Sequence, residues 1–175
     1  MPITVISEAI GFIGIVLSLL SFQQKKRENI LLFQMGASIS FSAQLFLVGA
    51  VTGGCMDLIS FARTLVFSFN DKKWASSKLW LAFFIAVMIF TGIFTWKDAL
   101  SILPMTGAVL STVALWMKKE KLILIISLFV GPCWLVYDIL SGAYTGAINE
   151  LLAMTSIIIG LVRLVKREKS LANNV

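Results

Sequence analysis

The stretch L-V-G-A-V-T-G occupies Leu47–Gly53, and the stretch L-S-G-A-Y-T-G occupies Leu140–Gly146. The two stretches are 93 positions apart (140 − 47 = 93). At this offset, and without gaps, 14 of the 45 residues in Gly14–Leu58 are identical to their counterparts in Gly107–Leu151. Similarity at a fixed offset is the signature of an internal repeat. The sequence therefore predicts a chain that is built twice.

The composition predicts a membrane protein. Of the 175 residues, 58% are hydrophobic and 14% are charged, whereas about 25% of residues are charged in an ordinary soluble domain. We expect a single integral membrane domain over 1–175, with the lipid bilayer as its main partner. The net charge of +6 comes from short basic clusters between apolar runs, which indicates a topology signal and no nucleic-acid partner.

Seven apolar segments are long enough to cross a bilayer. We expect all of them to be α-helical, because a lipid-exposed strand leaves its backbone polar groups without partners. The fold class is therefore an all-α membrane protein with seven transmembrane helices. The expected limits are Ile3–Phe22, Ile30–Val48, Gly53–Phe69, Leu79–Thr95, Ala99–Trp116, Leu122–Leu140 and Gly146–Val165.

Basic residues predict the orientation of these spans. When alternate sides of the membrane are counted, 13 of the 15 basic residues fall on one side, with Lys97 on the other and Arg63 inside the third span. An excess of Lys and Arg marks the cytoplasmic side, so we expect the N-terminus outside and the C-terminus inside. The 13 residues are Lys25, Lys26, Arg27, Lys72, Lys73, Lys78, Lys118, Lys119, Lys121, Arg163, Lys166, Arg167 and Lys169.

The duplication pairs spans one to three with spans five to seven. Four crossings separate the copies, so both copies have the same orientation, which gives a parallel repeat of three helices, one linker helix and three helices. The expected limits are about 3–69 for the first repeat, 78–95 for the linker helix and 99–165 for the second repeat. A short basic cytoplasmic tail follows at 166–175.

The arrangement of three, one and three helices resembles the SWEET-like and PQ-loop (MtN3-like) transporters, which implies a transporter fold with the same orientation. The chain also resembles the YgjV-type bacterial inner-membrane family, which implies a location in the bacterial cytoplasmic membrane. The residues that carry the second resemblance are Ala62–Leu65, Leu103, Pro104, Gly107, Ser111, Thr112, Cys133, Trp134, Gly142–Glu150 and Arg163.

Prolines distinguish the chain from the sugar transporters of the SWEET-like group. Those proteins carry a proline on four pore-lining helices, whereas here only Pro104 and Pro132 are present, and the first copy has Gly11 and Ile39 instead. A sugar substrate is therefore not implied. The candidate hinge or gate residues are Pro104, Pro132, Gly49 and Gly142, since glycine allows backbone angles that other residues resist.

Polar and aromatic residues within the spans are the candidates for a solute path, because such groups face protein or water in bilayer helices. A stripe of small residues that includes Ser18 and Ser111 either packs helices closely or leaves room for a solute. Trp134 and Tyr137 either stack against a flat solute or pack in the core. The candidate path residues are Arg63, Asp57, Asp138, Glu150, Asn149, Trp134, Tyr137, Gln44, Ser18 and Ser111.

Each charged residue within the spans has two possible explanations, one structural and one functional. Asp57 and Glu150 follow the repeated Thr-Gly turns, where acids either complement the positive N-terminus of a helix or form a vestibule for cations or protons. Arg63 lies near mid-membrane, where an arginine costs about 2.5–3.5 kcal/mol on insertion scales. We expect it to pair with a carboxylate across the repeats, from Asp138 or Glu150, unless it extends to the membrane surface.

The leading functional hypothesis is a transporter or facilitator of a small-molecule solute. The alternatives are a non-transporting receptor, scaffold or assembly factor, and an integral membrane enzyme. We expect no enzyme, cofactor or metal site, because the chain has no histidine and no GxSxG or HExxH motif. No feature of the sequence indicates an oligomeric state.

The orientation predicts the location of fused reporters. A reporter fused after Lys121 should report the cytoplasm, and one fused at Ala143 should report the outside, because one span separates the two positions. Paired phosphatase and fluorescent-protein fusions measure this. Reversal at either position would contradict both the seven spans and the parallel repeat.

Overall fold

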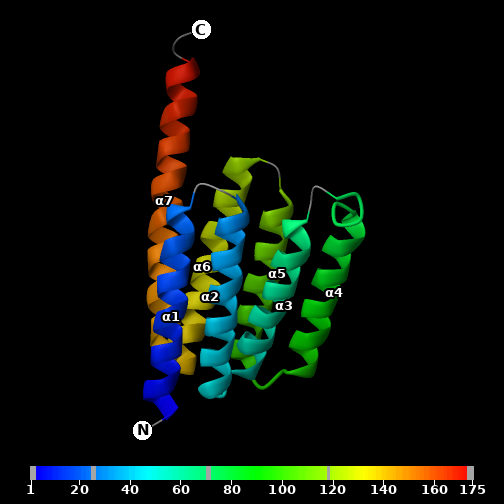
Figure 1. Ribbon diagram of the computed structural model, residues 1–175, viewed down its shortest axis with the longest axis vertical. Helices are drawn as coiled ribbons and strands as arrows, with labels where there is room; N and C mark the ends of the chain where they lie inside the picture. The colour runs from blue at the N-terminus through cyan, green and yellow to red at the C-terminus, as the bar shows by residue number, and fades with distance from the viewer. Residues whose placement is uncertain (1–2, 25–26, 70–71, 118, 173–175) are drawn as a thin grey trace.

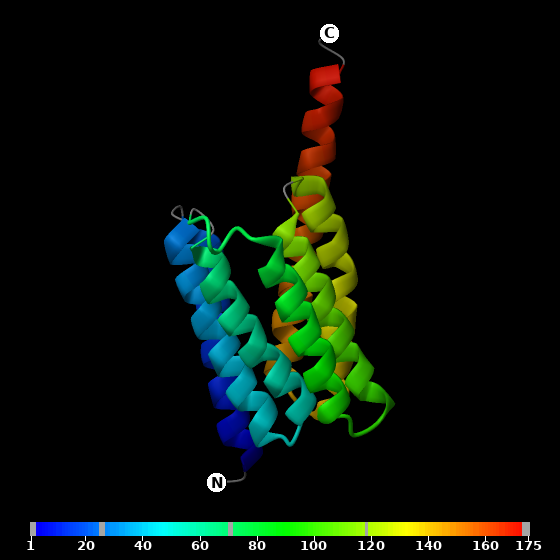
Figure 2. The same ribbon diagram turned by 90° about the vertical axis from the view of Figure 1, so that its right-hand side faces the viewer.

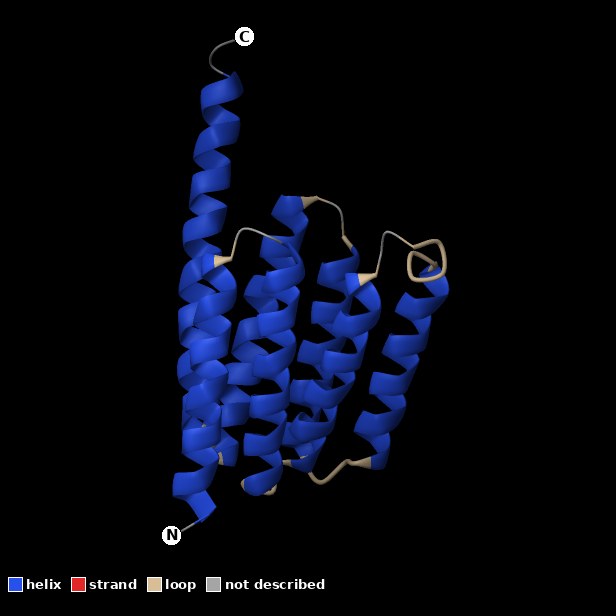
Figure 3. Ribbon diagram, in the orientation of Figure 1, coloured by secondary structure: helices blue, strands red, loops and turns tan. Residues whose placement is uncertain are grey.

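The computed structural model describes residues 3–24, 27–69, 72–117 and 119–172. These residues form seven α-helices and one 3-10 helix, and no strand is present among them (Figures 1 and 3). The elements are α1 Ile3–Gln23, α2 Arg27–Leu47, α3 Val51–Ser68, α4 Lys78–Phe94, η1 Ala99–Ser101, α5 Ile102–Trp116, α6 Glu120–Ser141 and α7 Tyr144–Ala172. The predicted all-helical fold is confirmed, with helix limits within a few residues of those expected, except at the end of α7.

The helices run alternately up and down, so that the two termini lie at opposite ends of the bundle (Figure 1). We call these the N-terminal end and the C-terminal end. The connections after α3 and α5 lie at the C-terminal end and carry Lys72, Lys73 and Lys119, whereas Lys97 lies at the N-terminal end. Three other basic residues of the orientation argument, Lys25, Lys26 and Lys118, lie outside the described residues.

Five helices are long and apolar enough to cross a membrane, namely α1, α2, α6, α7 and the η1–α5 segment. The other two expected spans, α3 and α4, are not among these five. Helix α4 is apolar but has only 17 residues. Helix α3 has 18 residues, among them Asp57 and Arg63, and is not one of the five.

Six of the helices form a closed ring. Helix α2 packs between α1 and α3, helix α6 packs between α5 and α7, and the ring is closed where α3 contacts α5 and α1 contacts α7. Helix α4 packs against α3 and α5 from outside this ring (Figures 1 and 2). The ring brings side chains from all six helices to one interior, which is where the polar residues of the spans lie.

The predicted glycine turns have the expected geometry. Gly49 and Gly142 both have φ of +77°, and no non-glycine residue in the described ranges has positive φ. In each turn the N–H of the next residue, an alanine, donates to the carbonyl four positions before the glycine, at 2.8 Å in both. Gly53 and Gly146 lie inside α3 and α7 and have ordinary helical angles.

The C-terminal tail differs from the expectation. The segment predicted as a short tail from residue 166 continues α7 as helix to Ala172, and this part projects beyond the bundle (Figures 1 and 2). Lys166, Arg167 and Lys169 are exposed there. Lysine, arginine and glutamate are good helix formers and this stretch has no proline or glycine, so the helix has no reason to end at the membrane surface.

Substitution of the turn glycines tests this geometry. Gly49→Ala and Gly142→Ala should each lower the free energy of unfolding by about 1–2 kcal/mol, because a β-carbon disfavours left-handed backbone angles. An added β-carbon at either site has no atom within 4 Å, so the cost comes from the backbone alone. Denaturation in mixed detergent micelles measures the change.

The matched control is Gly160→Ala in α7. There an added β-carbon makes ordinary contact with Leu124 at 3.7 Å, and alanine favours a helix interior over glycine. The control should be as stable as the parent protein or more so. Equal losses at the three glycines would show that the turns need no special backbone conformation.

Candidate functional site

The interior of the ring contains a cavity of about 320 Å³, which we call the main cavity. Its lining comes from all six ring helices, and it reaches Leu115 in the last turn of α5 and Ile123 in the first turn of α6. It therefore extends from the middle of the bundle toward the C-terminal end. The polar lining residues are Ser18, Gln34, Ser38, Asp57, Arg63, Thr64, Ser111, Ser127, Asn149 and Glu150.

A smaller space of about 150 Å³, the inner cavity, adjoins the main cavity on the side of the N-terminal end. The two cavities share five lining residues, including Asp57, Asn149 and Glu150. The inner cavity adds Gln44, Trp134 and Asp138. Residues that the sequence analysis selected from all six ring helices thus border two adjoining cavities.

Acidic residues are brought together at the inner cavity. Asp57, Asp138 and Glu150 are close enough for their charges to interact. The alternative explanation, a helix dipole, does not account for this position, because the first turns of α3 and α7 contain no acidic residue. The dipole effect fades beyond the first turn, so Asp57 and Glu150 lie too deep to be explained by it.

Arg63 links α3 to α5. Its Nη1 donates to Ser111 Oγ at 2.9 Å and to Thr112 Oγ1 at 2.7 Å, and the side chain is only 5% exposed. Its Nε has no partner. Arg63 therefore links α3 to α5, and its close partners are hydroxyl groups, with the carbonyl of Ala108 farther away at 3.5 Å.

The predicted ion pair of Arg63 is not formed. Within the described part of the chain no carboxylate lies within the 4 Å of an ion pair with it. Asp57 interacts with it only at longer range, because the two residues are six positions apart on α3 and point in different directions. Ser111 and Thr112 of the adjacent helix are the groups within reach.

Hydrogen bonds close the interior at the N-terminal end. Gln44 Nε2 donates to Thr145 Oγ1 and, at 3.2 Å, to Glu8 Oε1. The Glu8 carboxylate also accepts from the backbone N–H groups of Tyr144 at 3.1 Å and Thr145 at 2.9 Å. Glu8 thus caps the start of α7, and Gln44 links α2 to Glu8 of α1 and to Thr145 of α7. We call this set of contacts the Glu8 latch.

A second contact, between α6 and α3, lies beside the Glu8 latch. Tyr137 Oη of α6 accepts from the backbone N–H of Gly53 at 3.0 Å. The Tyr137 ring meets the Trp134 ring edge to face, with centroids 6.3 Å apart. Trp134 borders the inner cavity, whereas Tyr137 borders a different pocket, so the two rings do not form one platform for a solute.

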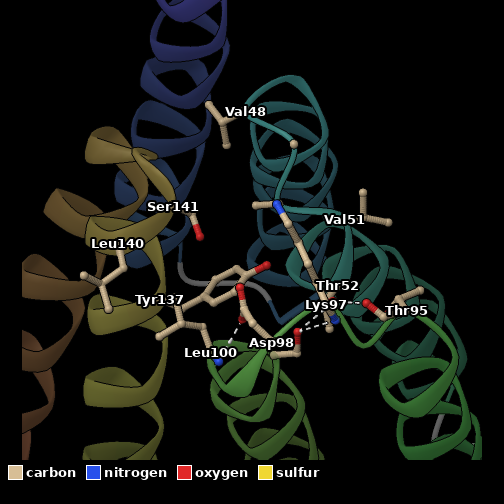
Figure 4. A pocket seen from close by; sticks show the side chains of 13 residues that line it. Val48, Val51, Thr52, Thr95, Lys97, Asp98, Leu100, Tyr137, Leu140 and Ser141 are labelled. Atoms are coloured by element: carbon tan, nitrogen blue, oxygen red, sulfur yellow. Dashed lines mark hydrogen bonds between the residues drawn. The ribbon is translucent and has the colours of Figure 1, made fainter.

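That other pocket, the outer pocket, has about 260 Å³ and lies at the N-terminal end (Figure 4). Thr52 donates to the carbonyl of Thr95 at 2.7 Å there, and Asp98 accepts from the N–H of Leu100 at 2.9 Å (Figure 4). Lys97 and Asp98 are exposed. The outer pocket shares no lining residue with the main cavity or the inner cavity, so it is separate from the acidic site.

The stripe of small residues faces both neighbouring side chains and a cavity. Gly14 packs against the ring of Phe41, and Gly107 packs against the indole of Trp134, so these positions admit bulky neighbours. Ser18 and Ser111 border the main cavity. Packing therefore explains the glycines, and the cavity explains the serines.

The two prolines differ in their effect on the backbone. Pro104 is the third residue of α5, where the N–H of a helix has no partner in any case. Pro132 lies inside α6, where it removes a helical hydrogen bond. A hinge at Pro132 therefore has a physical basis that a hinge at Pro104 lacks.

Sequence reasoning did not identify Thr112 as the partner of Arg63 or Thr145 as the partner of Gln44. A signal for Thr145 was present, since it belongs to the repeated Thr-Gly pair at Thr52 and Thr145. Thr112 stands beside Ser111 on a predicted polar face and had no separate signal.

The sequence profile of the family described as Imp-YgjV, bacterial inner membrane protein, matches residues 5–168. The chain therefore belongs to this family, and its apolar helices are in contact with the lipid of a bacterial inner membrane. Comparisons with curated proteins and with solved structures gave no match.

The link between α3 and α5 can be measured by mutation. Arg63→Ala should lower the free energy of unfolding by about 1.5–3 kcal/mol, because hydrogen bonds to a charged group are lost. Combined with Thr112→Val in a double-mutant cycle, it should show a coupling of at least about 0.5 kcal/mol. Arg163→Ala, which removes an exposed arginine on α7, should change stability by less than about 0.5 kcal/mol.

A coupling near zero between Arg63 and Thr112 would contradict the hydroxyl contacts described above. In that case the same cycle with Asp57→Asn would reveal whether a carboxylate takes their place.

Proposed function

We propose that the protein is a transporter or facilitator of a small solute in the inner membrane, and that it works by alternating access. The observation that carries the proposal is the main cavity, which has ten polar lining residues, is lined by helices of both proposed repeats, extends toward one end of the bundle and is closed at the other. A protein that only binds a partner at its surface does not need a polar interior of this kind, which is costly in a bilayer.

The moving parts in this proposal are two repeats of three helices, α1–α3 and α5–α7. The contacts at the closed end favour such a division. Gln44 and Tyr137 are 93 positions apart (137 − 44 = 93), and each reaches from the second helix of one group to the start of the third helix of the other. The closure is therefore made of two equivalent contacts, one from each repeat.

The hydrogen bonds at the closed end are weak enough to break and re-form during a conformational change. A neutral hydrogen bond contributes a net ~0.5–1.5 kcal/mol to stability, and a hydrogen bond to a charged group about 1.5–3 kcal/mol. The few bonds of the Glu8 latch and of Tyr137 thus contribute several kcal/mol at most. Two conformations that differ by a few kcal/mol are both accessible, and a solute that binds one of them more tightly shifts the balance.

The orientation completes the proposal. The basic residues Lys72, Lys73 and Lys119 lie at the C-terminal end, which by the positive-inside rule faces the cytoplasm. The conformation described here is then open to the cytoplasm and closed to the outside. Arg63 and Thr112 hold α3 to α5 beside the cavity, so that this side of the ring acts as the pivot.

Cysteine labelling tests alternating access. In a background with Cys55→Ser and Cys133→Ser, a reporter Ser38→Cys in the main cavity should react with a membrane-impermeant maleimide only from the cytoplasmic side. Adding Glu8→Ala, Gln44→Ala and Tyr137→Phe removes the Glu8 latch and the Tyr137 contact and should make the reporter react from the outside as well. Right-side-out and inverted vesicles separate the two sides.

The control reporter is Ile158→Cys, an exposed apolar position on α7, which should stay unreactive from both sides because it faces lipid. If the Ser38→Cys reporter reacts from one side only, whether or not the closing contacts are intact, the alternating-access proposal fails. A non-transporting receptor or assembly factor would then account better for the chain.

A further inference from the structure

The connection between α3 and α4 carries unpaired positive charge. Lys72, Lys73 and Lys78 are all exposed there. The same stretch has one acid, Asp71, which lies outside the described residues. Within the described part of the chain none of the three lysines forms an ion pair. Their positive charge is therefore available to a partner outside the protein.

Hydrogen bonds and ring contacts hold this connection in one compact shape. The carbonyl of Lys72 accepts from the backbone N–H of Ala75 at 3.0 Å. The carbonyl of Trp74 accepts from Trp80 Nε1 at 2.9 Å, which ties the turn to the start of α4. The Trp74 ring also contacts the rings of Phe69 and Trp80, with centroids 6.1 Å and 6.0 Å away. The lysines therefore project from a single folded unit.

This connection stands over the lipid that surrounds the ring. Helix α4 packs outside the ring, and the connection lies at its C-terminal end (Figures 1 and 2). The apolar side chains of Leu79, Phe83, Phe90 and Phe94 are exposed, and their spacing of four, seven and four residues places them on one face of α4. Such a face contacts acyl chains. The lysines at the start of the same helix therefore lie at the level of the lipid headgroups, where tryptophan is also favoured.

An unused hydrogen-bond donor accompanies the charge. The Trp74 side chain is half-exposed, and its indole N–H has no acceptor among the described residues, whereas that of Trp80 is used by the Trp74 carbonyl. Lysine ammonium groups and an indole N–H are donors only. A group that offers several negatively charged acceptor oxygens, such as a phosphate, is complementary to this set.

Neither helix stability nor membrane topology accounts for the whole arrangement. Lys78 is the first residue of α4, whose first turn contains no acid, and a positive charge is unfavourable at the N-terminus of a helix. The positive-inside rule explains the sign of the charge, but lysines anywhere on the same side of the membrane satisfy it. A ligand in the headgroup layer explains why the lysines stand beside a free indole N–H at the lipid-facing helix.

We propose that Lys72, Lys73, Trp74 and Lys78 bind the headgroup of an anionic phospholipid at the C-terminal end of the bundle. The lipid phosphate accepts hydrogen bonds from the ammonium groups and from the indole N–H, and an acyl chain lies along the apolar face of α4. A zwitterionic lipid carries its own cation beside the phosphate, so its attraction to the lysines is weaker. This interaction does not depend on the transport role proposed above.

Binding to the purified parent protein is measured first, by thermal shift in dodecyl maltoside micelles. The probe is dioleoylphosphatidylglycerol, and the matched probes are dioleoylphosphatidylcholine and soluble glycerol phosphate. We expect a concentration-dependent rise in melting temperature with phosphatidylglycerol, because a ligand of the folded state stabilises it by mass action. High salt should reduce this rise, since it screens exposed charges. An equal rise with phosphatidylcholine would overturn the proposal, and an equal rise with glycerol phosphate would show a site for free phosphate and not for lipid.

Two variants then locate the site. A triple variant with Lys72→Gln, Lys73→Gln and Lys78→Gln should raise the phosphatidylglycerol concentration at half-maximal effect at least tenfold. Trp74→Phe keeps an aromatic ring and removes the indole N–H, so it should cause a smaller rise in the same direction. Melting without lipid checks that both variants fold, and glutamine forms helices about as well as lysine. An unchanged titration in the triple variant would overturn the proposal.

The matched control removes the same amount of charge elsewhere at the same end of the protein. Lys166→Gln, Arg167→Gln and Lys169→Gln together neutralise three exposed basic residues on the part of α7 that projects beyond the bundle. This variant should bind phosphatidylglycerol like the parent protein. Equal losses in the two triple variants would show a general attraction between a basic protein and an anionic micelle, and would contradict a site at the connection between α3 and α4.

Discussion

The cost of placing polar groups in hydrocarbon is the constraint on which the rest of this structure depends. The bilayer offers no water, so backbone groups must bond within helices and polar side chains must face protein or an enclosed cavity. Six helices in a ring satisfy both demands at once. Glu8 and Gln44 bond to each other and to the start of α7, and Arg63 bonds to α5, so the same groups that must avoid lipid also hold the ring together. The acids that have no such partner border the cavity.

The two copies of the proposed repeat divide the polar groups unequally. Leu45 and Asp138 are 93 positions apart and occupy matching places, since Leu45 packs against Gly53 and Asp138 against Gly146. The first copy has Arg63 where the second has Ser156, which is exposed. The backbone turns remain equivalent while the interior charges differ. A duplicated scaffold can in this way keep its symmetric closure and still provide a single asymmetric site.

Sequence patterns predicted the helices, the glycine turns and most of the polar residues that border the cavities, because apolar length and the exclusion of polar groups from lipid are local properties. They did not predict which groups would bond. Gln44 meets Thr145 across 101 positions, and Arg63 meets Thr112 across 49. A polar face indicates that a side chain points inward, whereas its partner depends on which helices close the ring and at what depth. The expected carboxylate partner of Arg63 was wrong for this reason. The helical continuation of α7 past the expected tail had a local signal, its helix-forming residues, that a count of apolar residues does not detect.

The short helix α4 has a consequence for the surrounding bilayer. Its 17 residues span about 26 Å at ~1.5 Å per residue, less than the ~30 Å of a typical hydrocarbon layer. A hydrophobic segment shorter than the layer is accommodated by local thinning of the lipid. Helix α4 lies outside the ring beside α3 and α5, so the thinning is confined to one side of the protein. We therefore expect more thinning of the lipid beside α4 than beside the longer helices α1 and α7, which would give the protein a preferred orientation relative to its neighbours and a preference for thinner regions of the membrane.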